Sequence, residues 1–262
     1  MATGEKIETR SHIIGFREEI DSAARRGKDA FFTWFDNAQN ADVVFLRGQW
    51  DFMVHIGLPL SKYISNPEDR IALEIGHGGG RILLAACRSF KKAIGVDVHN
   101  NNKLVEAELK SRGVSNFELF KTNGSTIPVE DSIVDIVYSF IVLQHVEKID
   151  IFKRYLEETY RVLKSGGIAI LYFGRKCFYS SNSKSHFSYL IDYLLERLLL
   201  RKGFEELPAK VNCKNLVVSL RYAKKLAKEC GFLALKKCVS HKKVPDGIAL
   251  YGGQHGLILK KP

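Results

Sequence analysis

The sequence lacks any apolar run that would suffice to cross a membrane, since a spanning helix needs about 20 consecutive, mostly apolar residues. Its most leucine-rich stretch, residues 194–200, is interrupted by Glu196 and Arg197. The first six residues are polar, which is not the pattern of a secretory signal peptide. We therefore expect a cytoplasmic protein with no membrane span.

Cysteine is also scarce, and its spacing excludes the common metal motifs. The five cysteines are odd in number and widely separated, without a Cys-x-x-Cys pair or a Cys/His pattern. A secreted disulfide scaffold is therefore excluded. We expect reduced cysteines that are mostly buried, and no bound metal.

The chain does contain a run of glycines directly after a short apolar segment. Residues 71–75 are apolar apart from Glu74, and glycines follow at positions 76, 78, 79 and 80. Residues 82–86 are suited to begin a helix. Strand, glycine turn and helix together let a ligand approach bare backbone at the carboxyl end of a strand.

A second apolar segment, residues 93–97, ends in a carboxylate. Asp97 follows Gly76 by 21 residues (97 − 76). In nucleotide-binding α/β folds, an acid at the end of the second strand meets the ribose hydroxyls. Arg81 occupies the position where a dinucleotide-binding motif has a small residue, which argues against a nicotinamide cofactor. The alternative is that Asp97 binds no ligand and only stabilises a turn at the end of the strand.

The spacing Gly76-x-Gly78-x-Gly80, preceded by Glu74, resembles the first motif of class I S-adenosylmethionine-dependent methyltransferases. The resemblance covers roughly residues 68–262. It implies a doubly wound, mostly parallel seven-stranded α/β sheet whose last strand is antiparallel. It also implies S-adenosylmethionine as the cofactor, with the glycine loop around its methionine half and Asp97 on both ribose hydroxyls.

The resemblance assigns further residues to the cofactor. Glu74 would orient the loop or meet the cofactor's amino group, and His77 would pack beside the cofactor within the loop. Asn123 stands where the family usually has Asp and, with Gly124, would flank the adenine. The other expected contacts are Val98, after the second strand, and Ser139, at the end of the fourth strand, where the methionine portion should sit.

His145 is the candidate catalytic base, because it follows the fourth strand closely and imidazole accepts protons near neutral pH. The alternative is a histidine that caps or packs at the start of the next helix. Arg47 is a weaker candidate to bind the cofactor carboxylate. Further along the chain, Asn215 is suited to cap the last helix, in which Leu216 and Leu220 would be apolar positions.

Two additions to the α/β domain (68–262) are expected. Residues 1–67 form a largely helical N-terminal segment. Residues 174–214 form an insertion after the fifth strand that is too long for a plain connection. Its middle, residues 187–200, is too apolar for a disordered linker. We expect a partly helical cap over a substrate pocket, although its aromatic residues would equally suit a local hydrophobic core.

The formal charge of +11 raises the question of whether the protein acts on a nucleic acid or on a small molecule. The nucleic-acid motif Asp/Asn-Pro-Pro-aromatic is absent after the fourth strand, where Ser139-Phe-Ile-Val142 stands instead. We therefore favour a small-molecule methyl acceptor with an O or N nucleophile. An RNA methyltransferase and a catalytically silent cofactor-binding module stay open. The C-terminal cations are either a solvated face or a nucleic-acid surface: Lys224, Lys225, Lys228, Lys236, Lys237, Lys242, Lys243, Lys260 and Lys261.

Overall fold

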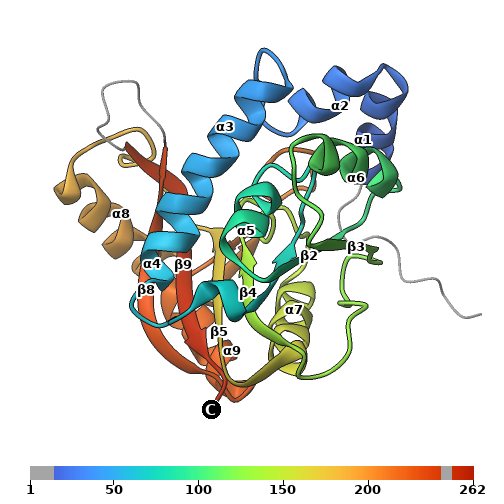
Figure 1. Ribbon diagram of the computed structural model, residues 1–262. Coiled ribbons are helices and arrows are strands. Elements are labelled where there is room, and N and C mark those ends of the chain that lie inside the picture. Colours follow the sequence, from blue (N-terminus) through green and yellow to red (C-terminus); the bar gives the residue numbers. More distant parts are fainter. Residues whose placement is uncertain (1–14, 243–249) are drawn as a thin grey trace, which may run out of the picture.

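The computed structural model describes residues 15–242 and 250–262, and within them a nine-stranded sheet runs through the centre of the protein (Figure 1). The strand order is β3-β2-β1-β4-β5-β7-β6, and β9 pairs antiparallel with β5 and with β8. All pairs from β3 to β7 along this order are parallel. The strands are β1 (Ile71–Ile75), β2 (Lys92–Asp97), β3 (Phe117–Lys121), β4 (Val134–Ser139), β5 (Leu163–Gly174), β6 (Phe204–Glu206), β7 (Leu216–Val218), β8 (Leu233–Lys242) and β9 (Leu250–Lys260).

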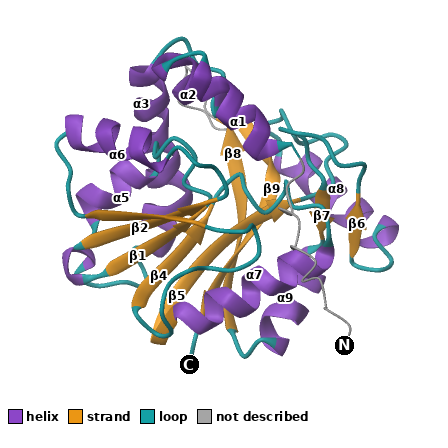
Figure 2. Cartoon of the chain, turned by 90° about the vertical axis from the view of Figure 1, so that its right-hand side faces the viewer, coloured by secondary structure: helices purple, strands orange, loops and turns teal. Residues whose placement is uncertain are grey.

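Helices cover both faces of this sheet, which is why its central strands are almost uninterrupted apolar runs (Figure 2). One hydrophobic core lies between the sheet and α5, together with the N-terminal helices. The second core lies between the opposite face and two helices that follow β4 and β7. The flanking helices are α5 (Leu83–Ser89), α6 (Asn102–Ser111), α7 (Ile149–Val162) and α9 (Leu220–Glu229).

The described part of the N-terminal segment is helical. Asn40 accepts a hydrogen bond from the Val43 amide and so caps the long helix α3. Phe31, Phe32 and Phe45 of this segment are fully buried against the sheet side of the molecule. The elements are α1 (Phe16–Arg25), α2 (Lys28–Trp34), α3 (Ala41–Phe52), a π-helical turn (Met53–Gly57), α4 (Leu58–Leu60) and a 3₁₀ turn (Pro67–Asp69).

The α/β prediction is confirmed, but the expected count of seven strands is too low. The two additional strands, β6 and β7, are short. β5 continues beyond the last residue of β4 that pairs with it, which leaves a free edge on which Gly174 pairs with Val217. The capping prediction is also wrong: Leu216 belongs to β7, and Ser219 caps α9 by accepting from the Tyr222 amide.

The insertion adds one further helix, α8 (His186–Leu199). It lies beside β8 and β9 at the edge of the molecule (Figure 1). All five cysteines are unpaired. Among the helices of residues 15–242 and 250–262, none is long and apolar enough to cross a membrane.

Candidate functional site

The chain leaves β1 through a turn that depends on glycine. Gly76, Gly78 and Gly80 have φ angles of 78°, 53° and 80°, in the left-handed region that other residues disfavour. A Cβ atom on Gly76 would collide with Val142, and one on Gly78 would lie 2.9 Å from a ring carbon of Phe35. Neither position therefore has space for a side chain.

Asp97 is tied directly to this loop, because β1 and β2 are parallel neighbours whose carboxyl ends meet at one edge. Its Oδ2 accepts a 2.7 Å hydrogen bond from the Gly78 amide, and its Oδ1 accepts one of 2.7 Å from the Val98 amide. Burial alone would raise the pKa of Asp97. The imidazoles of His99 and His77 and the two amides outweigh burial and hold that pKa below its usual value.

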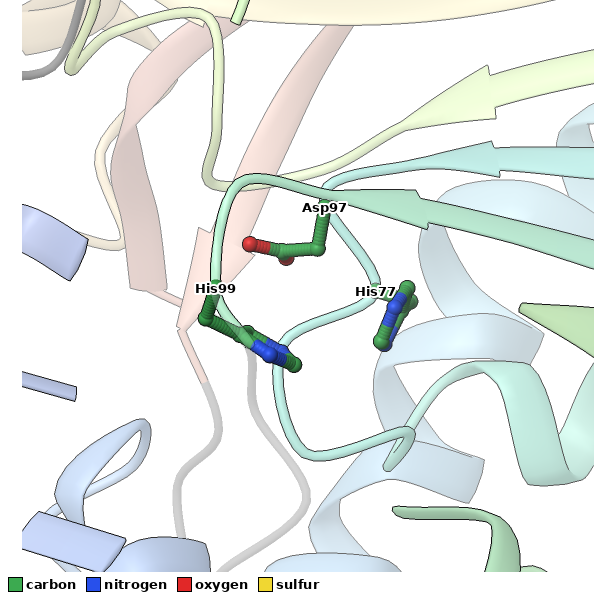
Figure 3. Close-up of side chains that lie close together, drawn as sticks. All are labelled: His77, Asp97 and His99. Atoms are coloured by element: carbon green, nitrogen blue, oxygen red, sulfur yellow. The ribbon is translucent and has the colours of Figure 1, made fainter. Parts of the chain in front are cut away.

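Two imidazoles complete the support of the loop (Figure 3). Nδ1 of His77 and Nε2 of His99 each lie 2.9 Å from the Gly78 carbonyl oxygen, to which each ring donates. Nδ1 of His99 accepts from the Asn101 amide at 3.1 Å. Burial lowers the pKa of His77 to about 4. Asp97 therefore holds the backbone amide of Gly78, and the two rings hold its carbonyl.

The same three side chains offer donor atoms within 4.8 Å of one another, a spacing that a metal ion could use. The observed contacts favour a structural role. His99 uses both ring nitrogens in hydrogen bonds to backbone, and His77 uses Nδ1. Of the described groups, none accepts or donates at Nε2 of His77, which is buried.

A pocket opens between the glycine loop, the end of β2, α1 and the segment that follows β4. Seven of its lining residues are site candidates predicted from the sequence, namely Glu74, Gly76, His77, Gly78, Asp97, Val98 and His145. The other lining residues were not among these candidates. Gly79, Arg81, Ile82 and Val96 lie beside them in the chain, and the following come from other segments: Phe16, Ile20, Phe35, Thr122, Phe140, Ile141, Val142 and Tyr155.

Four candidate residues lie behind the lining of this pocket. Gly80 packs against Val105 of α6. Oδ1 of Asn123 accepts from the Ser125 and Thr126 amides, so it is engaged in its own turn, and the Gly124 amide donates to Thr122. Ser139 is fully buried and donates to the Ile75 carbonyl at 3.2 Å. Thr122 stands in the lining beside Asn123.

At the other end of the pocket lies a buried acid. Burial raises the pKa of Glu74 to about 8, although the Tyr138 hydroxyl donates to its Oε2 at 3.1 Å. Glu74 is therefore largely protonated at neutral pH. Arg81, which lines the same pocket, forms a buried ion pair with Asp51 of α3.

His145 is anchored to the insertion. Its Nδ1 donates to the Cys213 carbonyl at 2.6 Å, and the Asn215 side-chain amide donates to the His145 carbonyl at 2.8 Å. Burial lowers the pKa of His145, so the ring is neutral at pH 7. This arrangement fixes the tautomer and leaves Nε2 as the basic atom, 3.4 Å from the Gln144 amide nitrogen.

A second cavity adjoins the first, and both share Phe140 and Ile141 as a wall. Arg47 lines this second cavity, not the first, and its NH1 lies 3.4 Å from Asp36 Oδ2. Lys214 lines it from the end of the insertion. The other lining residues are Asp36, Asp51, Gln144, Cys177, Ser181, Ser240, His241, Lys242, Gly252, Gly253 and Gln254.

Lys214 is half-buried at this wall. Its Nζ donates to the Arg175 carbonyl at 2.7 Å, and among the described residues no carboxylate lies within ion-pair distance of it. Burial lowers its pKa. The next residue, Asn215, donates through its backbone amide to the Gln144 carbonyl at 2.8 Å. Cys213, Lys214 and Asn215 therefore join the second cavity to the candidate base.

Comparison with known structures agrees with this fold. An S-adenosylmethionine-dependent methyltransferase from Methanosarcina mazei is 20% identical, with 78% of this chain and 96% of that chain covered and a TM-score of 0.53. One from Clostridium acetobutylicum is 15% identical (82% and 91% covered, TM-score 0.54). A complex between the Trm112 methyltransferase activator of Haloferax volcanii and a methyltransferase matches at 16% identity (95% and 98% covered, TM-score 0.57). No curated protein matches.

A match to a family model covers the part of the chain that contains the site. Residues 73–171, from β1 to β5, match the model described as a methyltransferase domain. This range includes the glycine loop, Asp97 and the segment after β4. Residues 73–171 are therefore similar to a methyltransferase domain, and the fold is similar to that of S-adenosylmethionine-dependent methyltransferases.

Proposed function

We propose that this enzyme methylates an oxygen or nitrogen atom of a small molecule that binds in the second cavity. The observation that carries the proposal is the wall shared by the two cavities, Phe140 and Ile141. A methyl acceptor in the second cavity would meet the cofactor pocket at this wall. The bound cofactor supplies a methyl group already activated on a sulfonium, so the protein mainly needs to align the acceptor and exclude water.

The residues of the first pocket fit S-adenosylmethionine. The Asp97 oxygens each accept one backbone amide, and a carboxylate has about four acceptor sites, so two hydroxyls can still be bound. Gly76 and Gly78 line this pocket and carry no side chain that would extend into it. Glu74, His77 and Val98 would complete the lining. We assign Gly80, Asn123, Gly124 and Ser139 to the support of this lining.

His145 is the proposed general base. Its ring is neutral, anchored at Nδ1 and part of the first pocket's lining. A base in this state can take a proton from an acceptor hydroxyl or amine through Nε2. An acceptor that is already a free nucleophile would not need it.

The position of the basic residues favours a small-molecule acceptor over RNA. Among the described residues that line the two cavities, none is a lysine of α9 or of the first part of β8. Lys224, Lys225 and Lys237 line a separate groove. Of the C-terminal lysines, Lys242 does line the second cavity, together with Lys214 and Arg47, but the lysines of α9 and Lys237 line neither cavity.

The test is to follow a radiolabelled methyl group from S-adenosylmethionine into a cell extract treated with the purified enzyme. The label should appear in the filtrate that passes a membrane retaining proteins and nucleic acids. The variant Asp97→Asn serves as the inactive control. Label that remains only in the retained RNA would contradict the proposal, and a wild-type enzyme that binds the cofactor without transferring any label would favour the silent module.

A further inference from the structure

In α8, the helix of the insertion, acidic side chains are buried and apolar side chains are exposed, which is the opposite of an ordinary surface helix. Its two acids, Asp192 and Glu196, are buried, with 0% and 1% of their surface exposed. Five of its large apolar side chains are exposed to solvent instead, whereas Ile191 and Leu195 are half-buried. A surface helix usually turns its apolar stripe toward the core and its charges outward, because burial of apolar surface stabilises the fold.

The buried acids determine this orientation. Asp192 accepts hydrogen bonds from the backbone amides of Phe178, Tyr179 and Ser180 at 2.8–3.2 Å. Glu196 accepts from the Lys176 amide at 3.0 Å. Rolling α8 over would expose these amides and leave the acids without their partners. The helix therefore cannot turn its leucines inward at a low cost.

The outward face carries four large apolar residues, which we name the α8 stripe: Phe187, Leu190, Leu194 and Leu198. They are between 43% and 71% exposed. Their spacing of three, four and four residues places them on a single face of the helix. A contiguous exposed apolar patch of this kind marks an interaction site.

The charges beside the stripe are of one sign. Arg197, Arg201 and Lys202, in the last turn of α8 and just beyond it, line a groove whose opposite side is formed by α9 and β8. This groove holds one acid, the buried Glu196. Its other cations are Arg221, Lys224, Lys225 and Lys237. The partner that covers the stripe should therefore combine an apolar interior with a negatively charged surface.

We propose that α8 docks this enzyme on the surface of an anionic lipid bilayer. The α8 stripe would enter the boundary between headgroups and acyl chains, while the neighbouring cations would contact lipid phosphates. A helix with one apolar face and only cations exposed beside it fits such a surface. RNA would match the cations but would leave the leucines in water. The proposal is independent of the methyl acceptor.

The experiment measures binding of the full chain to vesicles by flotation. One set contains 30% phosphatidylglycerol in phosphatidylcholine, and the other is pure phosphatidylcholine. We expect binding to the anionic vesicles at 50 mM salt, at least tenfold weaker binding to the neutral ones, and a steep loss as salt is raised. These readouts on the wild-type protein need no variant.

Two pairs of variants then separate the stripe and the cations from general effects. Leu194→Gln with Leu198→Gln should weaken vesicle binding at least tenfold. The matched control, Leu46→Gln with Leu58→Gln, changes two leucines that are equally exposed on the N-terminal helices and should not weaken it. Arg197→Gln with Arg201→Gln should also weaken binding, whereas Lys153→Gln with Arg154→Gln, on α7, should not.

Entry of α8 into the bilayer can be tested separately by tryptophan fluorescence. A Leu194→Trp variant should show a blue-shifted emission that brominated lipids quench, and a Leu46→Trp variant should not. The proposal is overturned by any of three results: no binding to anionic vesicles, equal binding to neutral ones, or no effect of the stripe variants. A dimer that the stripe variants dissociate, without vesicle binding, would instead assign this face to a second copy of the chain.

Discussion

The backbone amide of Gly78 donates a 2.7 Å hydrogen bond to Oδ2 of Asp97. The glycine loop is thereby fastened to the end of the neighbouring strand, and the Gly78 carbonyl is held on its other side by His77 and His99. Asp97 consequently has two tasks in our proposal. It shapes the loop, and it offers its remaining lone pairs to the cofactor ribose.

Replacing Asp97 should therefore weaken cofactor binding strongly. Loss of a charge-assisted hydrogen bond costs about 1.5–3 kcal/mol, which is roughly 10- to 150-fold in affinity. We expect Asp97→Asn to reduce the affinity for S-adenosylhomocysteine by this amount in isothermal titration calorimetry. If the folded variant bound S-adenosylhomocysteine with wild-type affinity, Asp97 would not contact the cofactor.

The matched control is Asp135→Asn. Asp135 is also partly buried and also accepts a backbone amide, that of Ile71, at 2.9 Å. It lies at the start of β4, where Arg70 and Lys164 contact it, at the opposite end of the parallel strands. This variant should lose stability while its affinity for the same ligand stays unchanged.

Two glycines with similar backbone angles should respond very differently to alanine. Gly76 and Gly113 have φ angles of 78° and 83°, so either substitution carries the left-handed penalty of roughly 1–2 kcal/mol. A Cβ on Gly76 would also collide with Val142, whereas one on Gly113 would meet nothing within 4 Å. We expect both variants to be less stable in urea, and only Gly76→Ala to lose ligand affinity. Unchanged affinity in Gly76→Ala would contradict the proposed position of the cofactor.

Substitution of His145 separates chemistry from binding. We expect His145→Ala to lower kcat by about 10²–10⁴-fold for a hydroxyl or protonated amine acceptor, because a general base contributes that much. Cofactor affinity should not change. Since burial lowers the pKa of His145 below 6.5, the kcat of the wild type should be flat above pH 6.5 and should fall at lower pH. The control is His186→Ala, at an exposed histidine on α8, which should keep the wild-type kcat. A His145→Ala enzyme with full kcat would show that His145 is not the general base.

Local sequence patterns were sufficient to predict the glycine loop and Asp97. The apolar run before Gly76 and the acid after residues 93–96 are continuous segments, and parallel pairing of β1 with β2 brings them together without further information. The expectation of a mostly parallel sheet is likewise met between β3 and β7.

Such local patterns could not predict contacts between distant segments of the chain. Phe16 and Phe35 reach the pocket because helices some 40 to 60 residues before the loop fold back over it. β7 exists only because β5 is longer than β4, which no residue of 216–218 reveals. The orientation of α8 was equally hidden, since its leucines alone suggest a buried face, and only the amides that surround Asp192 decide which side is buried.

The buried histidines and acids predict an optimum in stability at about pH 7. Below that pH the unfolded chain takes up protons that the folded chain refuses, so the free energy of unfolding falls as pH falls, by about 1 kcal/mol per pH unit for each imidazole. Burial lowers the pKa of five histidines, to about 4 for the first two: His55, His77, His145, His241 and His255.

Two acids act in the opposite direction. Burial raises the pKa of Glu74 to about 8 and that of Glu196 to about 7. Between about pH 4.5 and these values the folded chain keeps protons that the unfolded chain has released, so stability falls as pH rises. Unfolded imidazoles are still half-protonated at pH 6.5, so the histidines outweigh the acids up to about pH 7, and the acids outweigh the histidines above it. Urea unfolding at pH 5, 7 and 8 should show the maximum, and a steady rise through pH 8 would contradict these assignments.

Ile141 is held in a backbone conformation that its side chain disfavours. Its φ is 62°, a left-handed value that is costly for a β-branched residue, and its side chain forms part of the wall between the two cavities. We expect Ile141→Gly to be as stable as the wild type or up to about 1 kcal/mol more stable, and to lose kcat because the acceptor is no longer aligned. Ser132→Gly, at an exposed residue with φ of 56°, should gain stability with unchanged kcat. Thermal unfolding and initial rates on the three proteins decide the matter, and full activity in Ile141→Gly would show that the strained residue does not position the acceptor.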